Sequence, residues 1–356
     1  MRALIGTYTS GYPSAGLYVV DVSPDGRIEV QGVVPSIDPS FVVLHPQRPL
    51  AYVVNETGTE PGGLQVLSMV AGRQPQLVAT LALAGHLPCH LAVLPDGSGL
   101  IVAHYGCGRV QWLGLSQRGL PDGRSCVVQH VGSGPNPRRQ ASAHAHCVLV
   151  LENDVYVADL GQDAILHYRL AVGGDGLVQF VVQSRAAVHP GAGPRHLCAS
   201  ADGGRVYLSN ELDNTVSLFA RSARGDLQEQ TWCSTLPPEL NHSGARVRSA
   251  TSEVALHPNG RWLYVGNRGH DSVVTCELLA DGSPVAREWT ATGGAHPRHF
   301  ALVAEGAWLL VANRDGGSLQ LFAVGTVAGE LTAVGAPSVA VPAPVCVRWL
   351  PTALPH

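Results

Sequence analysis

The sequence predicts an all-β fold, a seven-bladed β-propeller with four-stranded antiparallel blades. Short apolar runs alternate with turns rich in glycine and proline, and the chain contains Gly 41 and Pro 25. One pair of apolar runs recurs along the whole chain with a period of roughly 50 residues, which is typical of a propeller blade. Stacking such units in a ring covers both apolar faces of each. We therefore expect residues 1–356 to form one propeller domain.

The recurring pair defines six complete units. The first run of the pair reads PSFVVLHP, PCHLAVLP, HAHCVLVL, PRHLCASA, TSEVALHP and PRHFALVA. The second run reads AYVVNE, LIVAHY, VYVADL, VYLSNE, LYVGNR and LLVANR. The third residue of the first run precedes the Asn-like position of the second by 14 residues in five units, and by 13 in the unit with His146. An alternating run such as TVSLFA follows each pair, and then usually a further apolar stretch.

The seventh unit is divided between the two chain ends. PVCVRWLP, starting at residue 344, matches the first run, while ALIGTYT and GLYVVDV near the N-terminus match the second and third. Pairing these segments within one blade would close the ring. We therefore expect the N- and C-terminal strands to share a sheet.

Composition excludes several functional classes. The formal net charge is -4, which indicates neither a nucleic-acid nor a membrane partner. The chain has no lysine, which excludes a GK[ST] phosphate loop and a Schiff-base lysine. The eight cysteines form no C-x-x-C pair, which favours buried thiols in a reducing compartment. No signal core or ~18-residue apolar run is present, so we expect a cytoplasmic protein, and a monomer.

The repeat brings polar residues to one rim of the predicted ring. The first strand of each blade lines the channel, so its start and the end of the second strand meet at the same mouth. The first column reads Phe41, His90, His146, His196, Glu253, His299 and Cys346, with Arg195 and Arg298 just before two of its members. The second column reads Glu56, Tyr105, Leu160, Glu211, Arg268 and Arg314, with Tyr8 from the divided blade.

Charged and imidazole groups at one mouth are costly to desolvate unless they pair or bind something. One interpretation is structural, since His or Glu near a strand start can tie neighbouring blades together. The other is a binding site. His144 and His146 have the spacing that points two side chains to one side of a strand, and with His90, His196 and Glu253 they could hold a metal. No accompanying ligand motif is present, so we expect neither metal nor cofactor. No G-x-S-x-G motif occurs, which favours attack by water.

Several motifs resemble those of the lactonase propeller family. They are IGTYTSG, RRQASAHAH, VYVADLGQD, PGAGPRHL, LSNEL, LYVGNRG and PVCV, in order from Gly6 to about Trp349. That family contains bacterial 6-phosphogluconolactonases of the cycloisomerase-2 type and the fungal carboxy-cis,cis-muconate lactonizing enzyme. The resemblance implies a metal-independent site of catalytic residues His146, Arg195, Glu211 and Arg268. The candidates for substrate binding are His90, His144, His196, Glu253, Arg298, His299 and Glu56.

The expected function is hydrolysis of a small anionic sugar lactone, with 6-phosphogluconolactone the leading substrate. Glu211 or His146 would take the proton of the attacking water. Arg195 and Arg268 would hold the oxyanion, or clamp a phosphate or carboxylate. Two alternatives stay open: a lactone-forming cycloisomerase acting on a muconate, and a non-catalytic propeller that binds a protein or peptide. The aromatic content of 6% disfavours the second of these.

Overall fold

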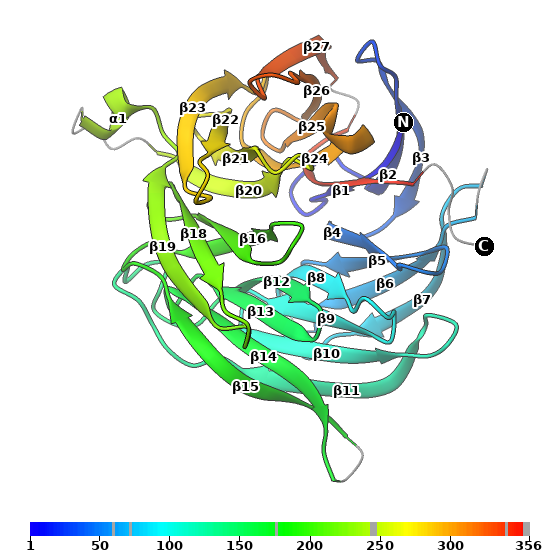
Figure 1. Ribbon diagram of the computed structural model, residues 1–356. Coiled ribbons are helices and arrows are strands. Elements are labelled where there is room, and N and C mark those ends of the chain that lie inside the picture. The colour runs from blue at the N-terminus through cyan, green and yellow to red at the C-terminus, as the bar shows by residue number, and fades with distance from the viewer. Residues whose placement is uncertain (59–60, 71–72, 175–176, 243–247, 339–340, 352–356) are drawn as a thin grey trace.

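The computed structural model describes residues 1–356 except 59–60, 71–72, 175–176, 243–247, 339–340 and 352–356. Seven antiparallel four-stranded sheets are arranged around a common centre, as the sequence predicts (Figure 1). Blade 1 consists of β28 (Pro344–Trp349), β1 (Arg2–Thr7), β2 (Gly16–Val22) and β3 (Ile28–Pro35). Blade 2 consists of β4 (Pro39–Leu44), β5 (Leu50–Asn55), β6 (Gly63–Ser68) and β7 (Gln76–Ala82). Blade 3 consists of β8 (Pro88–Val93), β9 (Gly99–His104), β10 (Arg109–Leu115) and β11 (Pro121–Gln129).

The remaining blades follow the same order from the centre outwards. Blade 4 consists of β12 (Ala145–Leu151), β13 (Asp154–Asp159), β14 (Ala164–Val172) and β15 (Val178–Ala187). Blade 5 consists of β16 (Pro194–Ala199), β17 (Arg205–Asn210), β18 (Thr215–Arg221) and β19 (Leu227–Ser234). Blade 6 consists of β20 (Ala250–Leu256), β21 (Trp262–Arg268), β22 (Ser272–Leu278) and β23 (Pro284–Ala291). Blade 7 consists of β24 (Pro297–Val303), β25 (Trp308–Asn313), β26 (Ser318–Val324) and β27 (Leu331–Ser338).

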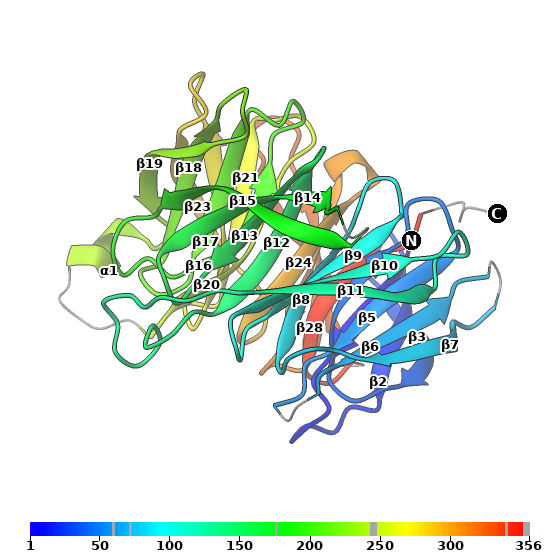
Figure 2. The ribbon, with the colours of Figure 1, turned by 90° about the horizontal axis from the view of Figure 1, so that it is seen from below.

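Burial decreases from the second strand of a blade to its outermost strand. Every residue of β9, β13 and β21 is buried, because neighbouring blades cover both faces of these strands. The residues of the outer strands β7, β11 and β15 are almost all exposed or half-buried. Figure 2 views the molecule onto two of them, β11 and β15. The apolar core therefore lies between the blades.

A repeated tyrosine ties neighbouring blades together. In four blades the second strand carries a fully buried tyrosine whose hydroxyl donates to the carbonyl of a glycine in the outer turn of the next blade. The pairs are Tyr52–Gly119 at 2.7 Å, Tyr156–Gly225 at 2.6 Å, Tyr207–Gly282 at 3.1 Å and Tyr264–Gly329 at 2.9 Å. Each of these glycines has a positive φ, which only glycine adopts at little cost.

The two chain ends close the ring within blade 1, as predicted. Strand β28 pairs antiparallel with β1, placing Cys346 opposite Gly6 and Pro344 opposite Thr7. The two strands lie side by side in Figure 1.

The helical segments are short: α1 spans Pro238–His242 and the 3₁₀ turn η1 spans Ala304–Gly306. Within the described ranges no helix has the length and apolar character needed to cross a membrane. All eight cysteines are free thiols, and four of them, Cys89, Cys147, Cys276 and Cys346, are buried.

Candidate active site

The innermost strands share an irregularity at the end where the predicted columns meet. In all seven blades the register with the second strand shifts near the strand start, as in a β-bulge, and in every blade but blade 6 the register identifies a single inserted residue. The inserted residues form the bulge ring: Ser40, Cys89, His146, Arg195, Arg298 and Val345. The next position along each strand forms the inner ring: Phe41, His90, Cys147, His196, Glu253, His299 and Cys346. Bulges re-aim side chains, and all six residues of the bulge ring line one cavity.

The structure corrects the predicted position of His146 by one residue. The sequence columns align His146 with His196, but Cys147 pairs with Ala158 as His196 pairs with Ser209. Cys147 therefore occupies the inner ring of blade 4, and His146 is equivalent to Arg195. This one-residue offset explains why the spacing is 13 residues in this unit and 14 in the other five.

Glu211, which follows β17, is held by three guanidinium groups. Its Oε2 accepts from Arg195 Nε at 3.1 Å and lies 2.7 Å from Arg268 Nη2. Its Oε1 accepts from Arg139 Nη2 at 2.6 Å. Glu211, Arg195 and Arg268 belong to the catalytic residues predicted from the sequence, and the structure brings the three together as the repeat implied. His146 lies near enough to this cluster for its ring and Glu211 to interact electrostatically.

The charges around Glu211 keep it ionised. Burial by itself would raise the pKa of Glu211, but Arg268 and Arg195 outweigh burial and hold the pKa well below its usual range. Burial lowers the pKa of Arg268 to about 10, against the opposing effect of Glu211, so this group stays charged at neutral pH.

Arg195 retains an unused donor. It is 2% exposed, and its Nη1 is buried without a hydrogen-bond partner within the described part of the chain. By contrast, Arg268 Nη2 also donates to the Thr251 carbonyl at 2.6 Å. A buried, unpaired guanidinium nitrogen beside a cavity is costly in the free protein and indicates a place for an acceptor atom of a ligand.

A second charged group lies two blades away from Arg195 on the bulge ring. Arg298 Nη2 donates to the Tyr8 hydroxyl at 2.5 Å, and the Tyr8 hydroxyl donates to Glu56 Oε2 at 2.9 Å. The guanidinium also lies over the Tyr8 ring, 5.1 Å from its centroid. Burial lowers the pKa of Arg298, but Tyr8 and Glu56 outweigh burial and raise it. Arg298 and Glu56 line the cavity together with Arg195.

The inner ring contains a carboxylate between two imidazoles. Glu253 Oε2 lies 2.9 Å from His196 Nδ1 and 2.9 Å from His299 Nε2. Burial would raise the pKa of Glu253, but His196 and His299 outweigh burial and hold the pKa well below its usual range. Burial, with Arg195, lowers the pKa of His196 to about 4, so its imidazole is neutral at pH 7.

Aromatic rings fill the channel at the level of the inner ring. The ring of Phe41 lies 4.2 Å from that of His90, 5.7 Å from that of His299 and 6.1 Å from that of His196. The rings of His90 and His196 are 5.4 Å apart. His90 does not line the cavity, whereas Phe41, His196 and His299 do. These side chains therefore form the floor of the site.

His144 lies outside the lining of the cavity. It precedes β12, its ring stacks on that of Tyr105 at 4.6 Å, and its Nδ1 lies 2.7 Å from the Tyr105 carbonyl oxygen. The bulge at His146 interrupts the alternation that was expected to point both imidazoles to one side.

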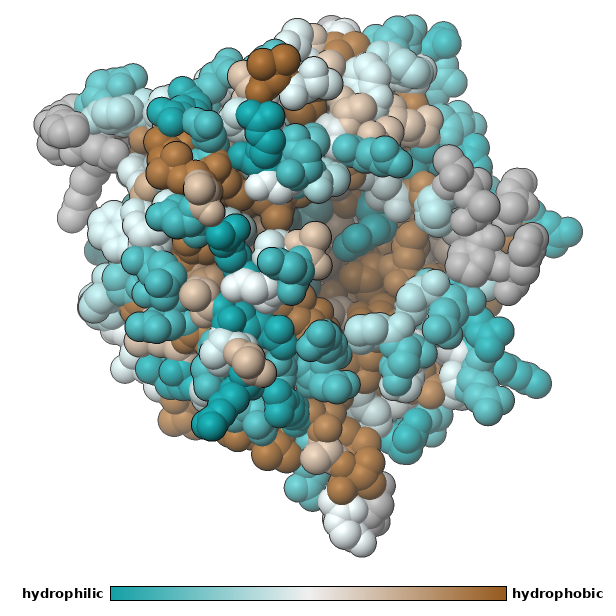
Figure 3. Space-filling view, viewed as in Figure 1, coloured by the Kyte–Doolittle hydropathy of each residue, from teal (hydrophilic) through white to brown (hydrophobic). Residues whose placement is uncertain are grey.

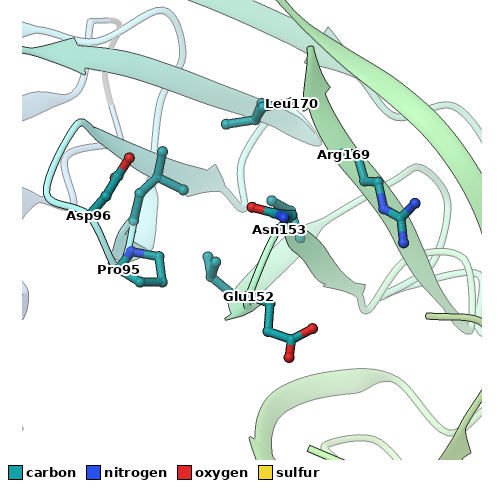
Figure 4. A pocket seen from close by; sticks show the side chains of 9 residues that line it. Pro95, Asp96, Glu152, Asn153, Arg169 and Leu170 are labelled. Atoms are coloured by element: carbon teal, nitrogen blue, oxygen red, sulfur yellow. The ribbon is translucent and has the colours of Figure 1, made fainter. Parts of the chain in front are cut away.

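The cavity is narrow: about 250 Å³ of space, open solvent included, lies between its side chains, and the part that admits a water molecule is about 10 Å³. The face seen in Figure 3 is hollowed near its centre, where the inner strands converge. A larger cavity of about 850 Å³ lies at the other end of β8 and β12 (Figure 4). Its lining includes Asp96, Glu152 and Arg169, and Arg169 is already paired with Asp154 at 2.7 Å. Within the described residues, none of the lining side chains has a buried polar atom without a partner.

Arg139 was not singled out from the sequence. It lies in the segment between β11 and β12, and besides Glu211 it reaches the Tyr105 hydroxyl at 3.1 Å. This segment is anchored by Gln140, whose Nε2 donates to Asp163 Oδ1 at 2.7 Å. Arg139 is the second arginine of the RRQASAHAH motif, but the repeat register places only residues at the ends of strands, and Arg139 lies in a loop.

Comparisons with known proteins agree with this architecture. Residues 2–349 match the family described as "Lactonase, 7-bladed beta-propeller". A 6-phosphogluconolactonase of Bacillus subtilis is 28% identical over 353 residues, which cover 97% of each chain. The crystal structure of a putative 6-phosphogluconolactonase of Bacteroides fragilis has a TM-score of 0.88 at 27% identity and covers 98% of both chains. The structure of a periplasmic gluconolactonase of Pseudomonas aeruginosa has a TM-score of 0.87 at 30% identity, also over 98% of both chains. The chain therefore belongs to the lactonase family of seven-bladed β-propellers.

Proposed function

We propose that this protein hydrolyses an anionic sugar lactone in the channel-mouth cavity, with 6-phosphogluconolactone as the leading substrate. The observation that carries the proposal is the unpaired, buried Arg195 Nη1 beside the cavity, next to a carboxylate already held by three arginines. Such a donor suits the oxygen of a lactone carbonyl as negative charge develops on it. The names of the relatives from Bacillus subtilis and Bacteroides fragilis support the choice of the phosphorylated lactone.

The charge of the site supports an anionic substrate. Four guanidinium groups face three carboxylates: Arg139, Arg195, Arg268 and Arg298 against Glu56, Glu211 and Glu253. The four arginines exceed the three glutamates by one positive charge, which an anionic ligand can balance. Arg139 is the most exposed of the four, with 41% of its side chain accessible, and we assign it to the phosphate or carboxylate of the substrate.

The roles follow from the geometry. Water attacks the lactone carbonyl carbon, and the oxyanion forms within reach of Arg195. Glu211, which is itself paired with Arg268, holds the guanidinium of Arg195 in place. Glu211 is a poor proton acceptor, because both of its oxygens already receive hydrogen bonds or ion pairs from arginines. The water proton therefore passes to a neutral imidazole, and both His146 and His196 line the cavity.

The test is a coupled assay in which freshly generated 6-phosphogluconolactone is the substrate and formation of 6-phosphogluconate is measured above spontaneous hydrolysis. Turnover that rises in proportion to protein concentration is the expected result. Glucono-δ-lactone and a muconate are assayed in parallel. Ring closure of the muconate without lactone hydrolysis would favour the cycloisomerase, and inactivity on all three would contradict an enzymatic role on these substrates.

A further inference from the structure

The three histidines of the inner ring use their Nδ1 atoms differently. His90 Nδ1 accepts the backbone N–H of Val148 at 3.3 Å, and His299 Nδ1 accepts that of Val347 at 3.3 Å. Each of these valines follows the inner-ring residue of the next blade. An Nδ1 that accepts an N–H carries no proton, so the proton of each neutral ring lies on Nε2. His90 and His299 therefore tie neighbouring blades together, which is the structural role expected of a histidine near a strand start.

His196 departs from this rule because the next blade carries a carboxylate. The equivalent N–H, that of Val254, donates to Glu253 Oε1 at 3.1 Å. Glu253 Oε2 then faces His196 Nδ1 at 2.9 Å. Since an ionised carboxylate only accepts hydrogen bonds, His196 Nδ1 must carry the proton, which leaves a lone pair on Nε2. Within the described part of the chain, Nε2 of His196 has no hydrogen-bond partner.

The carboxylate is itself held in place from three directions. Glu253 receives the Val254 N–H on Oε1, and His196 and His299 both donate to Oε2. The orientation of the His196 ring is thus set by a rigid, charged partner, as in carboxylate–histidine pairs that prepare a base. His196 also lines the cavity beside Arg195.

We propose that His196 is the general base of the lactonase reaction and that Glu253 is its positioning residue. The proposal rests on the proposed function and replaces Glu211 and His146 as candidates for this role. The Nε2 lone pair takes a proton from water as the water oxygen bonds to the carbonyl carbon, whose π electrons move to the oxygen near Arg195. The tetrahedral intermediate then collapses, the bond to the ring oxygen breaks, and that oxygen takes the proton back from Nε2. Lactone and water are thereby converted to the hydroxy acid, with no other reactant.

His146 lacks this preparation. Its Nδ1 lies 4.0 Å from the Cys89 thiol, and the described residues provide it with no hydrogen bond from or to a carboxylate. Burial, with Arg195, lowers the pKa of His146 well below its usual range. For His196 burial acts in the same direction. Glu211 opposes burial at His146 as Glu253 does at His196, but only Glu253 forms a hydrogen bond with its imidazole.

The first experiment compares kcat of three histidine-to-glutamine variants on the lactone that the wild-type protein hydrolyses best. His196→Gln is expected to lower kcat by about 10²- to 10⁴-fold, the usual contribution of general-base catalysis. His146→Gln is expected to lose at least tenfold less. His167→Gln is the matched control, because His167 is equally buried and pairs with Asp154 at 3.0 Å in β13 and β14, away from the cavity. Circular dichroism and thermal unfolding verify that all three variants fold.

The second experiment tests the positioning role through the pH profile of kcat. Glu253→Gln removes the charge that raises the pKa of His196, so the acid limb of the profile should move to lower pH while kcat falls. A purely structural role of Glu253 would leave the acid limb in place.

The outcomes separate the two proposals. Lactonase activity in the wild-type protein, with a kcat of His196→Gln equal to that of His167→Gln, overturns the base assignment alone. A larger loss in His146→Gln than in His196→Gln, or an acid limb that Glu253→Gln does not move, also overturns it. If the wild-type protein hydrolyses none of the lactones, the proposed function fails and the base assignment fails with it.

Discussion

Arg195 and Glu211 face each other across one hairpin, with Nε of the arginine 3.1 Å from Oε2 of the glutamate. They are neighbours because Pro194 pairs with Asn210 at the mouth of the channel and each charged residue follows its strand partner there. Arg268 reaches the same oxygen from the next blade at 2.7 Å. The ring therefore builds a cluster that no single blade contains.

Replacing Arg195 by alanine removes the buried donor assigned to the oxyanion. We expect kcat on the lactone to fall by about 10²- to 10³-fold, the usual loss for one such donor. Steady-state kinetics measure this loss. Arg287→Ala is the control, since Arg287 forms an exposed pair with Glu277 at 2.7 Å on the outer strand of blade 6. Equal rates in the two variants would remove Arg195 from the mechanism.

Replacing Glu211 by glutamine leaves three guanidinium groups facing one another without a counter-charge. We expect the free energy of unfolding to fall by about 3 kcal/mol, because breaking a buried ion pair from one side strands the partner charges. Denaturant titration checks this value. Glu277→Gln, which breaks an exposed pair, should change stability by less than about 0.5 kcal/mol. A Glu211 variant as stable as that control would show that solvent already screens the cluster.

Replacing Arg139 by alanine should affect binding more than chemistry. If this exposed guanidinium grips the anionic group of the substrate, KM for a phosphorylated lactone rises about tenfold while kcat changes little, which is the pattern of lost uniform binding. KM for an uncharged lactone should not change. Arg138→Ala, at the neighbouring exposed position, is the matched control. A rise of KM for both substrates would contradict recognition of the anion.

His189 predicts a pH dependence of stability away from the active site. Burial lowers the pKa of His189, but Asp213 and Glu229, at 2.6 Å and 3.0 Å, outweigh burial and raise the pKa to about 9. The unfolded value is about 6.5. The folded pKa is the higher one, so the contribution is complete below about pH 6.5 and is lost as the pH rises through about 9.

Allowing for solvent screening, we expect the His189 contribution to be about 1 kcal/mol. Thermal unfolding between these pH values measures it. In His189→Gln the decline over this range should be reduced by that amount. A wild-type decline of the same size as in the variant would show that the ion pairs contribute nothing.

The spacing of apolar runs was sufficient to predict the number of blades, their four strands and the closure by β28 and β1. These features depend on local alternation and on the need to cover apolar faces, which are visible in the order of residues. The same spacing brought Arg195, Glu211 and Arg268 to one mouth. It also indicated that His146 is out of register, because the spacing in its unit is one residue shorter than in the others.

Three-dimensional packing decided the rest. Whether His146 or Cys147 belongs to the inner ring depends on the bulge in β12, and a bulge is set by hydrogen bonds between strands. Arg139 comes from a loop, whose path no periodicity encodes. Most of all, the role of His196 differs from that of His299 although both belong to a PRH motif in the sequence. Their proton positions are determined by what the adjacent blade presents, a backbone N–H or the carboxylate of Glu253, and that neighbour exists only once the ring has closed.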